Sequence, residues 1–151
     1  MQLTRAADYA VRVMIHLAGL PPGTRVSRAD LSTAAECPEQ FLCKVLQNLT
    51  RAGLVVSHRG NTGGFELEDL CRNASILQIV EAVEGPIRLN ICLTSDHGCT
   101  RQSWCPAHCV WKEAQEAMIS VLRETNISHL AEKVADSRPS PVVVIGETRW
   151  N

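Results

Sequence analysis

A glycine-rich turn between two short β-prone runs, placed directly after three amphipathic segments, is the strongest constraint on how this chain can fold. The runs cover residues 54–58 and 65–67, and the turn between them holds three glycines and Arg59. Such a turn between β-prone runs is typical of a β-hairpin. Because these glycines lie between two strands and do not open a helix, the pattern argues against a dinucleotide-binding fingerprint.

The three segments before the hairpin have the period of amphipathic helices. They cover residues 4–20, 27–35 and 38–51, and apolar residues recur in them every three to four positions. Thr4 and Ser27 can cap the first two helices, and Pro38 suits the first position of the third. Helix, turn, helix and two-stranded ribbon in this order predict a winged helix–turn–helix.

Further helices are predicted after the hairpin, from Ser75 through Val83, from Pro106 to about Glu124, and from Ser128 to about Ala135. We therefore expect a mainly α fold with a small β-hairpin wing. The expected units are a winged helix–turn–helix domain at 1–85, a cysteine loop with a long helix at 86–135, and a flexible tail at 136–151.

Composition restricts the class of protein and its partners. Hydrophobic residues make up 45% of the 151 positions and charged residues 21%, which excludes a disordered chain. No apolar run approaches the ~20 residues of a membrane span, and the first 20 residues do not form a signal peptide, so we expect a cytoplasmic protein and no membrane partner. Residues 1–64 carry seven Lys or Arg against four acids, whereas the remainder carries eight against twelve. This division favours an anionic partner for the first half.

The polar face of residues 38–51 supplies side chains that donate and accept hydrogen bonds, the kind that can read base edges in a DNA major groove. The alternative is an ordinary amphipathic helix whose polar face is solvated. The predicted DNA contacts are Gln40, Lys44, Gln47 and Asn48 on the third helix, Arg59 and Asn61 in the wing, and Arg28 and Arg51 toward phosphate.

Seven cysteines, an odd number in a chain without a secretory signal, favour metal binding or redox sensing over structural disulfides. Cys92, Cys99 and Cys105 are separated by six and five residues, wider than the gaps of structural zinc knuckles. Three thiolates on one loop suit an iron–sulfur cluster. The candidates for a fourth ligand are His108, Cys109 and Asp8.

Two other functions stay open at this point. One is a regulator without a cluster, in which cysteines form a reversible disulfide. The other is a zinc-stabilised interaction module. An enzyme is not expected, because the sequence contains no nucleophile elbow, Walker-type phosphate loop or His-Glu-x-x-His pair.

Taken together, these residues resemble the IscR/NsrR/RirA family of bacterial winged-helix regulators, which carry iron–sulfur clusters. The resemblance covers about residues 1–135. It rests on Leu3-Thr4 with Asp8-Tyr9-Ala10, on Phe41-Leu42, Leu46, Leu49 and Ala52-Gly53-Leu54-Val55, on Arg59-Gly60 with Gly63-Gly64-Phe65-Glu66-Leu67, and on the loop with Cys92, Cys99 and Cys105.

The resemblance implies a homodimer in which the long helix, residues 106–124, crosses its twin. It implies a 4Fe-4S or 2Fe-2S cluster held by the three cysteines, with either His108 or Asp8 of the other subunit as fourth ligand. The segment from Cys92 to Cys99 is one residue longer than is usual in IscR-like loops.

The expected function is that of a dimeric, sequence-specific repressor of a double-stranded, pseudo-palindromic operator. Its DNA affinity would be set by a cluster that senses nitric oxide, redox state or iron–sulfur status.

Overall fold

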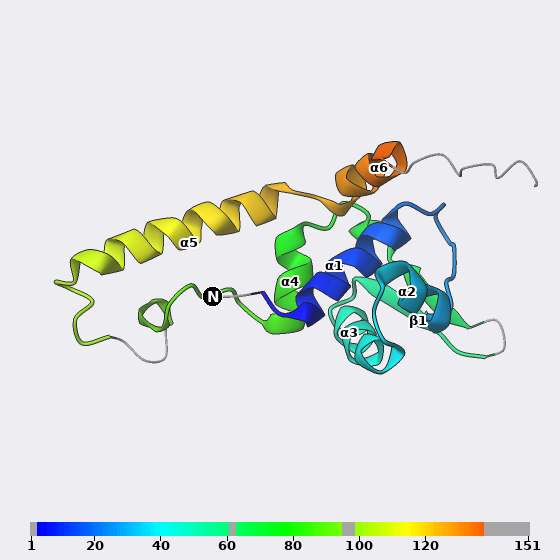
Figure 1. Cartoon of the computed structure of the whole chain (residues 1–151), viewed down its shortest axis with the longest axis horizontal. Coiled ribbons are helices and arrows are strands. Elements are labelled where there is room, and N and C mark those ends of the chain that lie inside the picture. Colours follow the sequence, from blue (N-terminus) through cyan, green and yellow to red (C-terminus); the bar gives the residue numbers. More distant parts are fainter. Residues whose placement is uncertain (1–2, 61–62, 95–98, 138–151) are drawn as a thin grey trace, which may run out of the picture.

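The computed structural model describes residues 3–60, 63–94 and 99–137 (Figure 1). In chain order its elements are α1 (Arg5–Ala18), α2 (Arg28–Ala35), α3 (Glu39–Arg51), β1 (Val55–His58), β2 (Gly64–Leu67), the 3₁₀ turn η1 (Asp69–Cys71), α4 (Ile76–Glu84), the 3₁₀ turn η2 (Ile91–Leu93), α5 (Pro106–Glu124) and α6 (Ile127–Ser137). The described residues are thus mainly helical with one two-stranded antiparallel hairpin, which confirms the expected fold class.

Side-chain caps start three of the helices where the sequence predicts them. Thr4 Oγ1 accepts a hydrogen bond from the backbone N–H of Ala7, and Ser27 Oγ accepts one from that of Asp30. Ser75 and Gln78 form a reciprocal capping box at the start of α4. These bonds satisfy backbone donors that the first turn of a helix leaves without a partner.

Several predicted helix boundaries differ from the observed ones by one or two residues; α1, for example, ends at Ala18 and not at residue 20. Pro38 has an extended backbone (ψ 134°) and precedes α3 as its N-cap, so the prediction that it occupies the first helical position is wrong by one residue. The last helix, α6, extends to Ser137, so the first two residues assigned to the tail continue a helix. The rest of the predicted tail, residues 138–151, lies outside the described residues.

The wing is joined to the segment that precedes α2. Strand β1 pairs antiparallel with β2, with Val55 opposite Leu67 and His58 opposite Gly64. Phe65 of β2 also bridges to Val26 through two backbone hydrogen bonds of 2.9 and 2.8 Å. The hairpin is therefore held on both sides of β2 and cannot swing away without breaking these bonds.

The aliphatic core surrounds α1, which contacts α2, α3, α4 and α6 (Figure 1). Met14, Leu31, Leu42, Leu49 and Ile79 are completely buried. Burying a side chain of this kind contributes about 1.5–3 kcal/mol relative to leaving it in water. This core fixes α3 against α1 and leaves one face of α3 for another role.

The long helix α5 extends away from this core, and none of its 19 residues is buried (Figure 1). The chain then returns, because α6 packs on α1 and Ile127 is fully buried in the core. The backbone N–H of Ile127 donates to the carbonyl of Ala74 at 3.1 Å. The predicted division of the chain at residue 85 stays a prediction. Helix α6 follows this division in sequence, yet it packs on α1, which precedes it.

No helix among the described residues is both long enough and apolar enough to cross a membrane.

Candidate nucleic-acid interface and cysteine segment

Helix α3 has one buried and one exposed face. Its buried face consists of Leu42, Val45, Leu46 and Leu49, each at most 1% exposed. At 100° per residue, the opposite face carries Gln40, Lys44, Gln47 and Arg51, and all four side chains are exposed. Asn48 lies at the edge of this face and is half-buried. The structure thus places five of the predicted DNA contacts on one accessible surface.

A groove of about 430 Å³ runs between α3 and the wing. Its walls include Gln47, Thr50 and Arg51 from α3 and Ser57 and Phe65 from the two strands. Polar side chains that donate and accept hydrogen bonds therefore line a concave surface next to the exposed face of α3. A helix presented beside a hairpin is the arrangement with which winged helices enter a major groove.

Arg28 borders the same groove and is held by two partners. Its Nε lies 3.1 Å from Glu39 Oε2, and its Nη1 lies 3.4 Å from Cys43 Sγ. The charge interaction with Cys43 and the hydrogen bond to Glu39 raise the pKa of Arg28 above its ordinary value. A phosphate at this position would have to compete with Glu39 for the guanidinium.

Near the turn of the wing, one carboxylate lies close to a histidine and an arginine. Glu66 Oε2 lies 2.8 Å from His58 Nε2 and 3.6 Å from Arg25 Nε. The strand register puts His58 and Glu66 in a diagonal cross-strand position on one face. Sequence reasoning missed this cluster, although the hairpin register, once known, predicts the pair. At the tip of the wing Arg59 is exposed, and Asn61 lies outside the described residues.

The three predicted cluster cysteines lie between α4 and α5. Cys92 is in η2 and Cys105 is the N-cap of α5, and both, like Cys99, are half-buried free thiols. Within residues 3–60, 63–94 and 99–137, no three His, Cys, Asp or Glu side chains stand close enough together to hold a metal ion. Cysteine thiolates are suitable ligands for an iron–sulfur cluster, but the described part of one chain does not bring three such ligands together.

The candidate fourth ligands differ in their surroundings. His108, in the first turn of α5, has a buried Nδ1 with no hydrogen-bond partner among the described residues. The Asp8 carboxylate is 54% exposed and forms an ion pair with Arg12 at 2.9 Å. Cys109 is exposed. His108 alone of the three therefore has a buried donor atom that is not engaged within the described structure.

Cys37 and Cys71 are in apolar surroundings. Cys37 is 3% exposed, and burial raises the pKa of its thiol. Burial, followed by the charge of Glu68, raises the pKa of Cys71 as well. Both thiols are therefore protonated at neutral pH and act as small packing groups.

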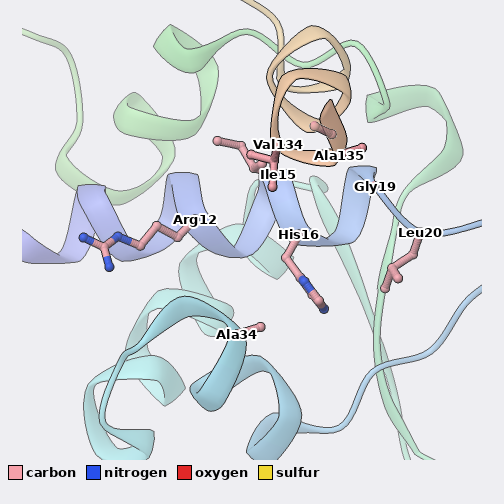
Figure 2. A pocket seen from close by; sticks show the side chains of 9 residues that line it. Arg12, Ile15, His16, Gly19, Leu20, Ala34, Val134 and Ala135 are labelled. Atoms are coloured by element: carbon pink, nitrogen blue, oxygen red, sulfur yellow. The ribbon is translucent and has the colours of Figure 1, made fainter. Parts of the chain in front are cut away.

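A second pocket, of about 320 Å³, lies where α6 meets α1 and α2 (Figure 2). Ile15 of α1 and Val134 and Ala135 of α6 line it, with Arg12 and His16 along α1. No predicted DNA contact or cluster ligand in the described part of the chain is among its walls.

The family of the chain follows from its similarity to known proteins. A family model described as "Rrf2: Iron-dependent Transcriptional regulator" matches residues 3–133. The chain belongs to the Rrf2 family. A Mycobacterium tuberculosis protein named as an HTH-type transcriptional regulator is 36% identical over 135 residues, which cover 87% of this chain and 81% of the relative.

Solved structures of similar fold include proteins named CymR and IscR. The oxidized form of Staphylococcus aureus CymR has a TM-score of 0.69 and 25% identity, over 87% of this chain and 97% of that one. IscR of T. potens has a TM-score of 0.70 and 21% identity, over 93% of each chain. These two structures confirm the winged-helix architecture. Together with the family match, they confirm the resemblance to IscR-like regulators that the sequence predicts.

As a member of the Rrf2 family, this chain is a helix–turn–helix transcriptional regulator and not an enzyme.

Proposed function

We propose that this Rrf2 protein is a homodimeric repressor whose affinity for a pseudo-palindromic operator is set by an iron–sulfur cluster. The observation that carries the DNA-binding part is the exposed face of α3 with Gln40, Lys44, Gln47 and Arg51, which lies beside the groove of the wing. The match to a family described as iron-dependent supports the cluster part.

The reading of DNA follows from the side chains on α3. Gln40 and Gln47 carry both donors and acceptors, so they can discriminate base edges, whereas Lys44 and Arg51 supply charge to phosphates. In a twofold dimer the two α3 helices would enter successive major grooves about 34–36 Å apart. If each subunit neutralises about three phosphates, the slope of log affinity against log salt is about −5.

Helix α5 supports the dimer. Val110, Trp111 and Val121 are 59%, 41% and 64% exposed, so the 19-residue helix leaves these three apolar side chains in water in one chain. Pairing with the α5 of a second copy would bury them. Val121→Glu should therefore convert the dimer to monomers in analytical ultracentrifugation, whereas Lys112→Glu, a change to an exposed polar position of the same helix, should leave it dimeric.

Cys92, Cys99 and Cys105 would hold the cluster, with His108 as the fourth ligand. This choice of the fourth ligand follows from the unpartnered, buried Nδ1 of His108, whereas the carboxylate of Asp8 is paired with Arg12. When bound, such a cluster supplies iron sites that respond to nitric oxide, oxidants and iron shortage. Cys105 and His108 lie at the start of α5, so a cluster bound to them can change the position of this helix, through which the dimer would form.

Anaerobic purification with quantification of iron and acid-labile sulfide tests the cluster. We expect a coloured protein, loss of colour in Cys99→Ser, and an altered visible spectrum in His108→Ala. Cys71→Ser, which changes a packing thiol, is the matched control and should retain the spectrum. An unchanged spectrum in His108→Ala together with a changed one in Asp8→Ala would transfer the fourth position to Asp8.

A thiol–disulfide switch is the second candidate. It is supported by the similarity to S. aureus CymR, which has been solved in an oxidized form, and by seven free thiols in this chain. A regulator of this kind would change its DNA affinity with reductant and not with an iron chelator. A protein that holds zinc and no sulfide would instead point to a zinc-stabilised module.

A further inference from the structure

A pocket of about 330 Å³ lies on the flank of α3 that faces away from the wing groove. Its apolar wall is formed by Ala6 of α1, Phe41 and Val45 of α3, and Val83 of α4. Volumes in this range are typical of pockets that take small organic molecules. The core that joins these three helices therefore leaves a preformed recess next to the face assigned to DNA.

The polar groups at this pocket are cationic. Arg5 and Lys44 line it, and no Asp or Glu does. Among the described residues neither cation forms an ion pair, in contrast to Arg28, which Glu39 holds. The carboxylate of Glu84, next to Val83 in sequence, is engaged by the backbone N–H of Thr4 at 2.8 Å. The pocket thus combines an apolar interior with two lining cations that have no ion-pair partner among the described residues.

The exposure of Phe41 indicates that no side chain of the described residues fills the pocket. Its side chain is 58% exposed, although aromatic residues gain most from burial. A ligand with an apolar ring could cover it, and the ammonium of Lys44 and the guanidinium of Arg5 would meet a negative group on the same ligand.

We propose that this pocket binds a small organic anion with an apolar body about the size of one or two rings. The apolar wall takes the body, and Arg5 and Lys44 take the carboxylate, sulfonate or phosphate group. The hydroxyl of Tyr9 and the amide of Asn48, which also line the pocket, can supply neutral hydrogen bonds.

Occupancy of the pocket would oppose DNA binding, a consequence that rests on the proposed function. Lys44 and Asn48 line the pocket and also belong to the surface assigned to the operator. A ligand that engages them removes two DNA contacts. The pocket would therefore make the protein responsive to a metabolite in addition to any cofactor on the cysteine segment.

The test uses two fluorescent probes with the same rings and the dimeric protein without DNA. 1-Anilinonaphthalene-8-sulfonate carries a negative charge, and N-phenyl-1-naphthylamine does not. We expect saturable binding of the sulfonate with one site per subunit, weakened about tenfold by Arg5→Gln. Binding of the neutral probe should change less than about twofold. Arg51→Gln, which removes a cation from the other flank of α3, is the matched control and should leave both affinities unchanged.

A space-filling variant tests the location of the site. Ala6→Leu narrows the pocket and should weaken both probes, and Val83→Met provides the same test from α4 if Ala6→Leu fails to fold. Equal affinities for the two probes, or a sulfonate affinity that Arg5→Gln or these substitutions leave unchanged, would overturn the proposal.

The consequence for DNA is measured separately, by titrating duplex DNA at saturating sulfonate probe. We expect a loss of DNA affinity of at least about fivefold, and an unchanged affinity would overturn the competition. If the protein binds no duplex at all, the proposed function fails, whereas the probe titrations still decide whether the pocket is an anion site.

Discussion

Gly64 is the position at which one added methyl group should damage the wing most directly. A Cβ built at this residue would lie 2.7 Å from the carbonyl oxygen of Val26 and 3.1 Å from its carbonyl carbon. Both neighbours are backbone atoms, so no side-chain rotation can relieve the overlap. Strand β2 and the segment before α2 must move apart.

That movement stretches the two hydrogen bonds between Val26 and Phe65, now 2.9 and 2.8 Å long. Each backbone hydrogen bond contributes about 0.5–1.5 kcal/mol net, so Gly64→Ala should lower the free energy of unfolding by about 1–3 kcal/mol. The wing, displaced from α2, should also present Arg59 poorly, so we expect DNA affinity to fall.

Urea denaturation followed by circular dichroism measures the loss, read as a lower midpoint at an unchanged slope. Gly19→Ala is the matched control, because Gly19 has helical φ and ψ (−75° and −7°) and its Cβ would meet no heavy atom closer than 3.5 Å. That substitution should be neutral or stabilise the protein by up to about 1 kcal/mol. A free energy of unfolding for Gly64→Ala within about 0.5 kcal/mol of the original protein would refute the reasoning.

Three further predictions concern the core, the DNA surface and the thiols. Leu46→Ala removes a 1% exposed side chain of α3 and should cost about 2–5 kcal/mol in urea denaturation; a loss below about 1 kcal/mol would contradict the core assignment. Arg51→Gln should weaken binding to all DNA sequences and reduce the salt slope by about 1, whereas Gln47→Ala should relax discrimination at one base position, and the opposite result would exchange their roles. Cys37, whose pKa burial raises, should react with iodoacetamide more slowly than exposed Cys109, and its rate should continue to rise at pH values where an ordinary thiol has levelled off. Equal rates, measured by mass spectrometry, would show that Cys37 is accessible.

Local interactions explain why so many helix starts could be predicted. Thr4, Ser27 and Ser75 cap helices through bonds to residues three positions later, and α5 begins at Pro106, where the ring matches the backbone angle of a first turn. Such interactions depend on neighbours in sequence, so the sequence contains them in full. The polar face of α3 follows in the same way from the period of its apolar residues.

The cysteine segment shows the limit of this reasoning. The spacing of Cys92, Cys99 and Cys105 identifies donors of suitable chemistry, but spacing along a loop does not set the distances between sulfur atoms. The described part of one chain brings no three such donors together. The distances between these sulfur atoms depend on contacts outside the local sequence.

Local sequence patterns were enough to predict the order of the helices, the hairpin between them and the chemical character of the exposed face of α3. The three-dimensional structure was needed to show that α6 returns to α1, that Arg28 is held by Glu39 and Cys43, and that a cation-lined pocket lies between α1, α3 and α4. The reason is that these features join side chains from different elements. Whether such side chains meet depends on how whole helices pack against each other. That packing is set by the burial of many apolar residues at once, not by neighbours in sequence.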